Sequence, residues 1–485
     1  MDINKSIYYL SLAANQHHPE AQYYLGCIFS DDKYISRDIK KSIHFYTLAA
    51  NQNHSMAQYN LASIYLEGKF IKKDINKAIY YYTLSAQQNN PKAQNNLALI
   101  YLEGTYTTRN INKAIYYFTM AANQNISGAQ NNLGFIFYEG KYVKRDINKA
   151  IHYFTLAAEQ NDSNSQLNLG YIYFENKYIK RDINKSIHYY SLAANQNDSD
   201  AQFAIGFIYS KNKYIKRDMN KAIYYYSLAA NQNHPKAQYE LGMYYINGLF
   251  VKMNINKAIN YFYLSANQSD INAQFVLGVI YFEGKFIKRN IDKAIHYYSN
   301  ASSFNHAFAK NNLAVIYKNG IIGKINLGYA IELLKEAIKL NDIISMYNLA
   351  HLYIYEEIEN INYDVIIKIL INSSFNFFPS QMLLSLVLIK KHKSISLEII
   401  KNEIKKYEQN KKIDQLIYNI HELIKEINIL NIFDQMYNDF KIIDFMHGYN
   451  NDAIQTNLLI EAKKNEKNHK NKNIDHSFYE GFAIN

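Results

Sequence analysis

Residues 74–109 read DINKAIYYYTLSAQQNNPKAQNNLALIYLEGTYTTR, and units of this length follow one another along most of the 485-residue chain. The first six residues return every 36 positions, as DINKSI at Asp2, NINKAI at Asn110 and NLGYAI at Asn326. Ten copies begin in this way without an insertion or deletion, and a degenerate eleventh, NYDVII, begins at Asn362. A fixed period of this size is the signature of a repeat fold, in which each unit packs on its neighbours.

Each unit contains two helical patterns. After the Asp or Asn anchor, apolar and small residues stand at Ile75, Ala78, Ile79, Tyr82 and Ala86, which is the stripe of one helix face. We name this predicted helix B and expect the anchor side chain to cap its first turn. A polar NQN-type stretch breaks the pattern, and the second helix, named helix A, follows as in PKAQNNLALIYLEG.

The ends of helix A carry their own signals. Pro stands where a first helical position is expected, because its fixed φ suits that position. The exit of helix A carries Gly or Asn, the residues that tolerate the left-handed conformation of a helix C-terminal cap. The prolines are Pro19, Pro91, Pro235 and Pro379, and the exit residues are Gly68, Gly104, Gly140, Gly248, Gly284, Gly320, Asn176 and Asn212.

A small residue in the middle of helix A predicts close helix packing. Large rings surround it, and we interpret this aromatic stripe as core between helices; a ligand-binding box is the alternative. The small residues are Gly26, Ala62, Ala98, Gly134, Gly170, Gly206, Gly242, Gly278, Ala314 and Ala350.

Composition excludes several classes of protein. The single cysteine, Cys27, cannot form an intramolecular disulfide, so a disulfide-stapled scaffold and a cysteine-rich zinc site are both excluded. The longest apolar run, 382–389, is far shorter than the roughly 20 residues that span a bilayer. The N-terminus lacks the pattern of a secretory signal. These features predict a cytoplasmic protein without a membrane span, and a nuclear address stays open.

The unit resembles the Sel1-like repeat, a relative of the tetratricopeptide repeat. The resemblance rests on A-x-x-x-L-G-x-[IF]-[YF]-x-x-G, on D-x-x-K-A after a short loop, and on the helix ending in AA, and it covers about residues 1–390. It implies an all-α fold: an α-solenoid of about eleven antiparallel helix pairs in a right-handed superhelix that serves as a scaffold for protein complexes. Some disulfide-rich relatives are linked to β-lactam hydrolysis, and this chain lacks their paired cysteines.

Three regions are predicted. Residues 1–393 form the solenoid; its first repeat is incomplete, so we expect the natural chain to continue upstream or the gene boundary to be misplaced. Residues 394–462 form helices that cap the stack. Residues 463–485 form a disordered basic tail that ends in the aromatic motif IDHSFYEGFAIN, either a docking motif or a frayed end.

No catalytic, cofactor or metal site is predicted, because no phosphate-binding loop, HExxH, paired-cysteine motif or nucleophile elbow occurs. His44, His152, His188 and His296 share one position of helix B, about 10 Å or more apart in a solenoid, too far to share a metal. Basic pairs such as Lys144/Arg145 recur in the loops between the helices. These pairs could form a positive track that binds nucleic acid or an acidic partner, or they could simply be solvated loop residues. Of these, we do not expect nucleic-acid binding.

The residue after the small position of helix A differs from copy to copy, and we name it the variable position. It is occupied by Cys27, Ser63, Leu99, Phe135, Tyr171, Phe207, Met243, Val279, Val315 and His351. By resemblance to tetratricopeptide arrays it faces a concave groove, where an apolar helix or extended peptide would bind; the alternative is that curvature buries these side chains against neighbouring helices. The predicted groove residues are Leu167, Tyr171, Phe174, Phe203, Phe207, Tyr239, Met243, Ile246, Phe275, Val279 and Phe282.

The sequence therefore predicts a non-enzymatic scaffold or adaptor that binds a protein or peptide segment without a cofactor. Capture of a carboxyl terminus is not expected, because the Asn of the tetratricopeptide carboxylate clamp is absent. The alternatives are the regulatory repeat region of a larger enzyme, for example a kinase, or an adaptor in endoplasmic-reticulum quality control. Replacing Tyr171, Phe207 and Met243 with Ser should abolish partner capture while the chain stays helical.

Overall fold

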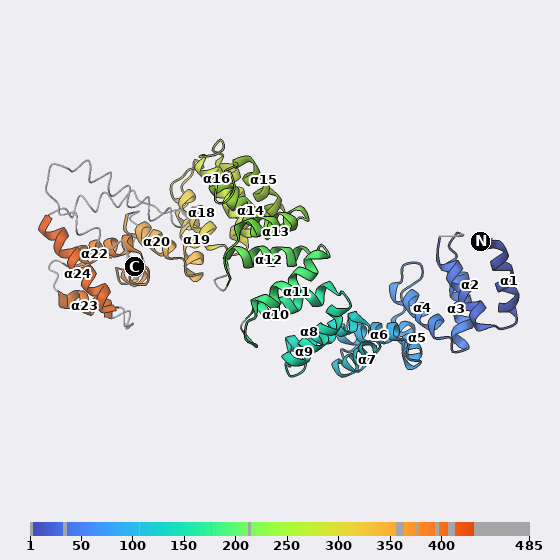
Figure 1. The fold of residues 1–485 in the computed structure, drawn as a ribbon. Helices are drawn as coiled ribbons and strands as arrows, with labels where there is room; N and C mark the ends of the chain where they lie inside the picture. The colour runs from blue at the N-terminus through green and yellow to red at the C-terminus, as the bar shows by residue number, and fades with distance from the viewer. Residues whose placement is uncertain are drawn as a thin grey trace. The chain divides into compact units, whose positions relative to one another are not determined.

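The computed structural model describes residues 3–32, 36–105, 107–175, 177–211, 215–355, 363–374, 377–392, 397–405 and 413–430. In these ranges 24 helices follow one another and no strand occurs, which confirms the all-α solenoid prediction (Figure 1). The segment 431–485, with the predicted basic tail and its aromatic motif, lies outside the described residues.

Helix B of each repeat is an odd-numbered helix and helix A is an even-numbered one. The helices B are α1 (Ile3–Asn15), α3 (Ile39–Asn51), α5 (Ile75–Gln87), α7 (Ile111–Asn123), α9 (Ile147–Glu159), α11 (Ile183–Asn195), α13 (Met219–Asn231), α15 (Ile255–Asn267), α17 (Ile291–Ser303), α19 (Leu327–Lys339) and α21 (Tyr363–Ser374). The helices A are α2 (Pro19–Ser30), α4 (Ser55–Glu67), α6 (Pro91–Glu103), α8 (Ser127–Glu139), α10 (Ser163–Phe174), α12 (Ser199–Lys211), α14 (Pro235–Asn247), α16 (Ile271–Glu283), α18 (Ala307–Lys318), α20 (Ile343–Tyr355) and α22 (Phe378–Lys391). Two further helices, α23 (Leu397–Lys405) and α24 (Ile413–Leu430), lie in the predicted cap.

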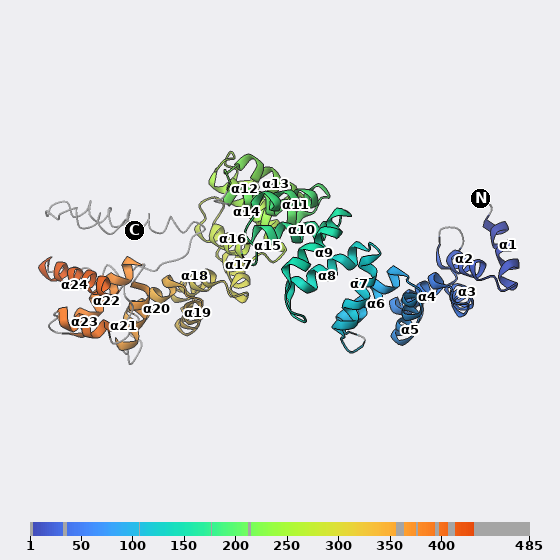
Figure 2. The same cartoon turned by 60° about the horizontal axis from the view of Figure 1, so that its bottom comes forward.

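The chain divides into two compact units, Met1–His234 and Pro235–Asn485, here named unit 1 and unit 2. Within each unit, a helix A packs most extensively on the helix B that follows it, and that helix B packs on the next helix A (Figure 2). This nearest-neighbour packing is that of a solenoid. The handedness of the superhelix and the boundaries 1–393, 394–462 and 463–485 stay predictions.

The anchors cap helix B as predicted. The Asp74 carboxylate accepts a hydrogen bond from the backbone N–H of Lys77 at 3.0 Å, which satisfies one of the free amides of the first turn. In the preceding unit, Gly68 closes helix A with φ +65°, in the left-handed region that favours glycine. The same cap contact is made by Asp38, Asn110, Asp146, Asp182, Asp218, Asn254, Asn290 and Asn326. Positive φ is also found at Gly104, Gly140, Gly248, Gly284 and Gly320, whereas Asn176 and Asn212 lie outside the described residues.

A second left-handed position closes the ten helices B from α1 to α19, and the sequence analysis treated it only as a polar break. Asn53 has φ +61°, and its N–H donates to Ala50 O at 3.0 Å. The N–H of His54 donates to Ala49 O at 3.1 Å, which completes a Schellman motif. The equivalent residues are His17, Asn89, Asn125, Asn161, Asn197, Asn233, Ser269, Asn305 and Asn341.

The small position of helix A faces a buried ring of helix B. A Cβ added at Gly170 would lie 2.5 Å from Cδ1 of Tyr190, so only a small residue fits this close approach. The rings at this position of helix B are 0–5% exposed, which confirms that they are core. They are Tyr46, Tyr82, Phe118, Phe154, Tyr190, Tyr226, Phe262 and Tyr298.

Buried glutamines link neighbouring repeats, a feature that the sequence analysis missed. Gln58 donates Nε2 to Ala50 O at 3.1 Å, and its Oε1 accepts from Nε2 of Gln88 at 2.7 Å. Each such pair in unit 1 joins a helix A to the helices B on both sides of it, and we name the whole series the glutamine ladder. Its pairs are Gln22–Gln52, Gln58–Gln88, Gln94–Gln124, Gln130–Gln160, Gln166–Gln196 and Gln202–Gln232 in unit 1, and Gln238–Gln268 in unit 2.

Candidate functional site

The variable positions of unit 1 lie on the surface of helix A that we name its inner face. Two rings on adjacent helices A are the most open: Phe135 of α8 is 51% exposed and Tyr171 of α10 is 43% exposed. Phe207, at the same position of α12, is partly buried. These neighbouring helices A contact each other directly, so their variable positions form one continuous surface.

Ring contacts between adjacent helices A hold this surface in place. The ring of Tyr138 on α8 meets Tyr171 of α10 edge-on, with centroids 6.4 Å apart. One repeat further, Phe174 meets Phe207 in the same geometry at 6.2 Å. Such edge-to-face contacts are favourable for aromatic pairs. We name Phe135, Tyr138, Tyr171, Phe174 and Phe207 together the inner aromatic row.

One carboxylate lies within the inner aromatic row. The hydroxyl of Tyr171 donates a hydrogen bond to Oε1 of Glu175, one helical turn later. This hydrogen bond, more than burial, raises the pKa of Tyr171, because it stabilises the protonated phenol beside an anion. The Tyr171 ring is therefore neutral at physiological pH and is oriented by its hydroxyl.

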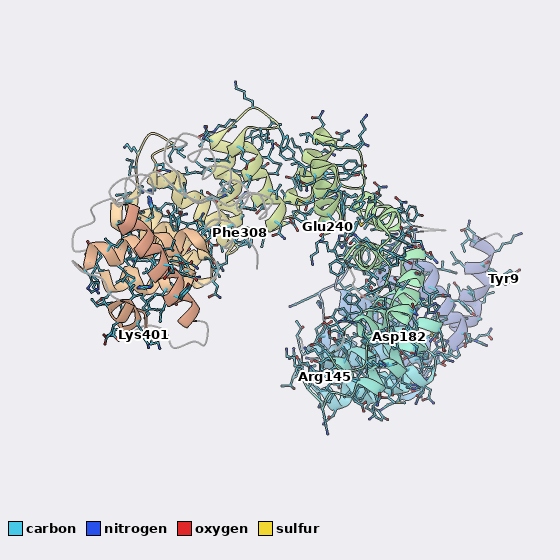
Figure 3. All side chains as sticks on the ribbon, turned by 60° about the vertical axis from the view of Figure 1, so that its left-hand side comes forward. Tyr9, Arg145, Asp182, Glu240, Phe308 and Lys401 are labelled. Carbon is cyan, nitrogen blue, oxygen red and sulfur yellow. The ribbon has the colours of Figure 1, made fainter. Side chains whose placement is uncertain are left out.

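Arginines border the inner aromatic row, and their side chains form hydrogen bonds to backbone carbonyl groups of the fold. Arg145, which is labelled in Figure 3, lies at the surface. It donates Nε to Tyr138 O at 2.8 Å, at the carbonyl end of α8, and its guanidinium carbon lies 4.6 Å from the ring centroid of Tyr178. Arg181 donates Nε to Phe174 O at 2.6 Å. Cations at the C-terminus of a helix satisfy free carbonyl groups and favour the dipole. The second residue of these basic pairs thus has a structural role, while Lys144 and Lys180 are exposed.

The remaining predicted groove residues of unit 1 and those of unit 2 are less accessible. Leu167 and Phe203 are partly buried, and the Phe203 ring stacks on His234 with centroids 4.7 Å apart. Tyr239, Met243 and Phe282 are also partly buried, and burial raises the pKa of Tyr239 to about 12. Ile246, Phe275 and Val279 are 2%, 5% and 1% exposed. These three side chains are therefore buried, which is the alternative to a groove position that the sequence left open.

The list of predicted groove residues omitted Phe135, the most exposed ring at the variable position. Its place in the repeat was the available signal, since Phe135 occupies the same position as Tyr171 one unit earlier. The repeated histidines His44, His152, His188 and His296 are exposed, as predicted.

Neither a metal site nor a membrane span is found in the part of the chain that the structure describes. No group of three or more His, Cys, Asp or Glu side chains there could hold a metal ion. No helix among these residues is long and apolar enough to cross a bilayer.

Several solved structures are similar to this chain, and two of them are described here. A protective antigen present in uropathogenic Escherichia coli strains, which displays an SLR fold, is 21% identical, with a TM-score of 0.68 over 90% of this chain and 94% of that one. A Sel1 repeat protein from Oxalobacter formigenes is 28% identical, with a TM-score of 0.55 over 64% of this chain and 89% of that one. A search of curated protein sequences finds no match.

The family comparison agrees with the structural one. The Sel1 repeat model matches residues 2–18, 19–54, 55–90, 91–126, 127–162, 163–198, 199–234, 235–270, 271–303, 307–342 and 343–357. Arrays of this kind are typical of protein-interaction scaffolds and are typically not catalytic. Because these matches cover well over half of its residues, the chain belongs to the Sel1 repeat family.

Proposed function

We propose that this protein is a non-enzymatic scaffold that holds an apolar segment of a partner protein on the inner faces of α8, α10 and α12. The observation that carries the proposal is the inner aromatic row, where Phe135 and Tyr171 are 51% and 43% exposed on adjacent helices. Large rings exposed side by side are typical of a protein-interaction surface. The partner segment is an amphipathic helix or an extended peptide with apolar side chains.

The exposed rings set the size of the expected effect. Fully burying a large apolar side chain contributes about 1.5–3 kcal/mol, so covering two half-exposed rings contributes about 2 kcal/mol in total. A loss of about 2 kcal/mol raises Kd roughly 30-fold. The rings of Phe174 and Phe207 have less surface left to cover because they already contact each other.

The test is affinity capture from the native cell with the full chain, comparing three forms. The first is the unchanged protein and the second carries Phe135→Ser and Tyr171→Ser. The third carries Tyr80→Ser and Tyr116→Ser, which remove two rings that are 58% and 59% exposed on helices B instead of helices A. The third form therefore controls for the loss of exposed aromatic surface as such.

Proteins retained by the unchanged chain and by the helix B variant, but lost from the Phe135/Tyr171 variant, support the proposal. Circular dichroism must show equal helicity in all three forms. If the Phe135/Tyr171 variant retains the same partners as the unchanged chain, the inner aromatic row is not the binding surface. Loss of helicity in that variant would instead assign these rings to the core.

A further inference from the structure

Three consecutive loops of unit 1 carry an exposed lysine at the same place in the repeat. Lys144 follows α8, Lys180 follows α10 and Lys216 follows α12, at steps of 36 residues. Within the part of the chain that the structure describes, none of the three forms an ion pair with a carboxylate. We name these three residues the lysine row.

The charged groups beside the lysine row are already engaged by the fold. Arg145 donates Nε to Tyr138 O at 2.8 Å and Nη2 to Glu139 O at 2.7 Å. The Asp146 carboxylate accepts from the backbone N–H of Lys149 at 3.0 Å and lies 3.8 Å from Nζ of the same lysine. The arginine is therefore committed to the end of α8, and the carboxylate is compensated within its own helix. The ammonium group of Lys144 is left to the solvent.

Contacts between successive loops keep the lysine row on one edge of the stack. The guanidinium carbon of Arg145 lies 4.6 Å from the ring centroid of Tyr178 in the next loop. The Tyr178 ring in turn meets Tyr138 edge-on, with centroids 6.1 Å apart. The helices A that precede the loops also contact one another, α8 with α10 and α10 with α12. Because packed helices lie roughly 10 Å apart, successive lysines of the row are separated by about 10 Å.

The loops of the lysine row have an excess of positive charge. Residues 139–145 and 175–181 each carry three basic residues and one acidic residue. Residues 211–217 carry four basic residues and no acidic one. A continuous excess of one sign attracts a partner of the opposite charge.

We propose that the lysine row binds an acidic segment of a polypeptide. In the extended polyproline II conformation, every third residue faces the same side, at intervals of about 9 Å. A carboxylate at every third residue of such a segment therefore matches the spacing of the lysines. Each pair is an exposed ion pair, so the binding depends on several pairs together and weakens with salt.

The charge density of this edge fits a polypeptide better than a nucleic acid. Duplex DNA carries one negative charge per roughly 1.7 Å, which is about six over the length of one repeat. Residues 139–145 supply a net charge of only +2 over that length. Single strands are held largely by bases stacked on open aromatic rings. The Tyr178 ring already has Arg145 and the Nζ of Lys177 at 4.6 and 5.1 Å from its centroid.

This inference is independent of the proposed function. The lysine row lies in the loops after the helices A, whereas the apolar segment is proposed to lie on their inner faces. It is also measured with a probe that has no apolar side chains.

The probe is fluorescently labelled poly-L-glutamate of about 20 residues, long enough at about 3.1 Å per residue to pass all three lysines. Its anisotropy is followed at low ionic strength as full-length protein is added. One variant replaces the lysine row by Lys144→Gln, Lys180→Gln and Lys216→Gln. The control replaces three exposed lysines of other helices by Lys92→Gln, Lys236→Gln and Lys335→Gln. A third variant carries Lys144→Arg, Lys180→Arg and Lys216→Arg.

Loss of the lysine row should raise Kd for the probe about tenfold, because three exposed ion pairs are removed together. The control variant has the same net charge but should raise Kd much less, since it removes only attraction from a distance, which salt screens. The arginine variant should bind like the unchanged protein, because it keeps the charges. Circular dichroism should show equal helicity in all four proteins.

Three results would overturn the inference. Equal weakening in the two glutamine variants would show that net charge alone attracts the probe. Absence of binding to the unchanged protein would show that the row holds no acidic segment. An oligothymidylate of the same length that binds more tightly than the probe, and is lost in the same variant, would assign the lysine row to nucleic acid instead.

Discussion

Replacing Phe304 with Gln should stabilise unit 2 by completing the glutamine ladder. In seven repeats, the Gln that follows helix B donates Nε2 to the buried Gln of helix A at 2.7–2.9 Å. Phe304 stands at this position after α17, and the acceptor it would face, Oε1 of Gln274, is buried without a hydrogen-bond partner. The backbone conformation at Phe304 already matches that of a ladder glutamine, since φ and ψ are −97° and 25° at Phe304 and −95° and 20° at Gln268.

The magnitude follows from two opposing terms. A buried acceptor left without a partner costs about 1–3 kcal/mol, which the new donor would remove. The Phe304 ring is 57% exposed, so its loss removes less than half of the roughly 1.5–3 kcal/mol that full burial contributes. The expected net gain in the free energy of unfolding is about 1 kcal/mol. Phe304→Met also removes the ring but supplies no donor, and it should lose up to about 1 kcal/mol.

Urea unfolding followed by circular dichroism measures the difference between these two variants. With a denaturant slope of about 1–3 kcal/mol per molar urea, a gap of about 2 kcal/mol separates the midpoints by roughly 0.7–2 M. Hydrogen exchange at the amides of α16 and α17 locates the effect, because in a repeat array a change acts mainly on neighbouring repeats. Equal midpoints for Phe304→Gln and Phe304→Met would refute the idea that the Gln274 oxygen lacks a donor.

Two further substitutions test the packing and the caps. Gly134→Ala should destabilise unit 1 by about 1–3 kcal/mol, because the new Cβ would lie 2.6 Å from Cδ1 of Phe154. Gly128→Ala in the same helix has nothing within 4 Å and should instead stabilise it by up to about 1 kcal/mol; thermal unfolding that ranks the two in the opposite order would contradict the packing account. Burial raises the pKa of Asp270, the cap of α16, above its ordinary value of 3.8. The charged carboxylate therefore destabilises the folded state at neutral pH. The free energy of unfolding rises as the pH falls through the raised pKa toward the ordinary one. Asp270→Asn keeps an acceptor for the Ala273 N–H, now at 2.8 Å, and should stabilise unit 2 at pH 7 by about 0.5 kcal/mol. Unfolding midpoints of both proteins at pH 7 and below pH 3.8 check this, and a gain that persists at the lower pH would show that charge burial is not its cause.

Sequence alone determined the period, the helix order and most helix ends of this protein. These features depend on contacts within a repeat or between adjacent repeats, so they recur with the residues that cause them. The Asp74 cap bonds an amide three residues away, and Gly170 lies under a ring that is 20 residues further along the chain. A 36-residue pattern records such contacts directly.

Only the tertiary structure decided which surfaces are open and which side chains are joined. Gln130 and Gln160 are 30 residues apart, and only the stacking of successive helices brings their amides within 2.7 Å. Asn132 and Asn312 are the same residue at the same repeat position, yet one is partly exposed and the other buried. Exposure depends on everything that packs around a side chain, and a pattern that repeats unchanged carries no record of contacts that differ from one repeat to the next.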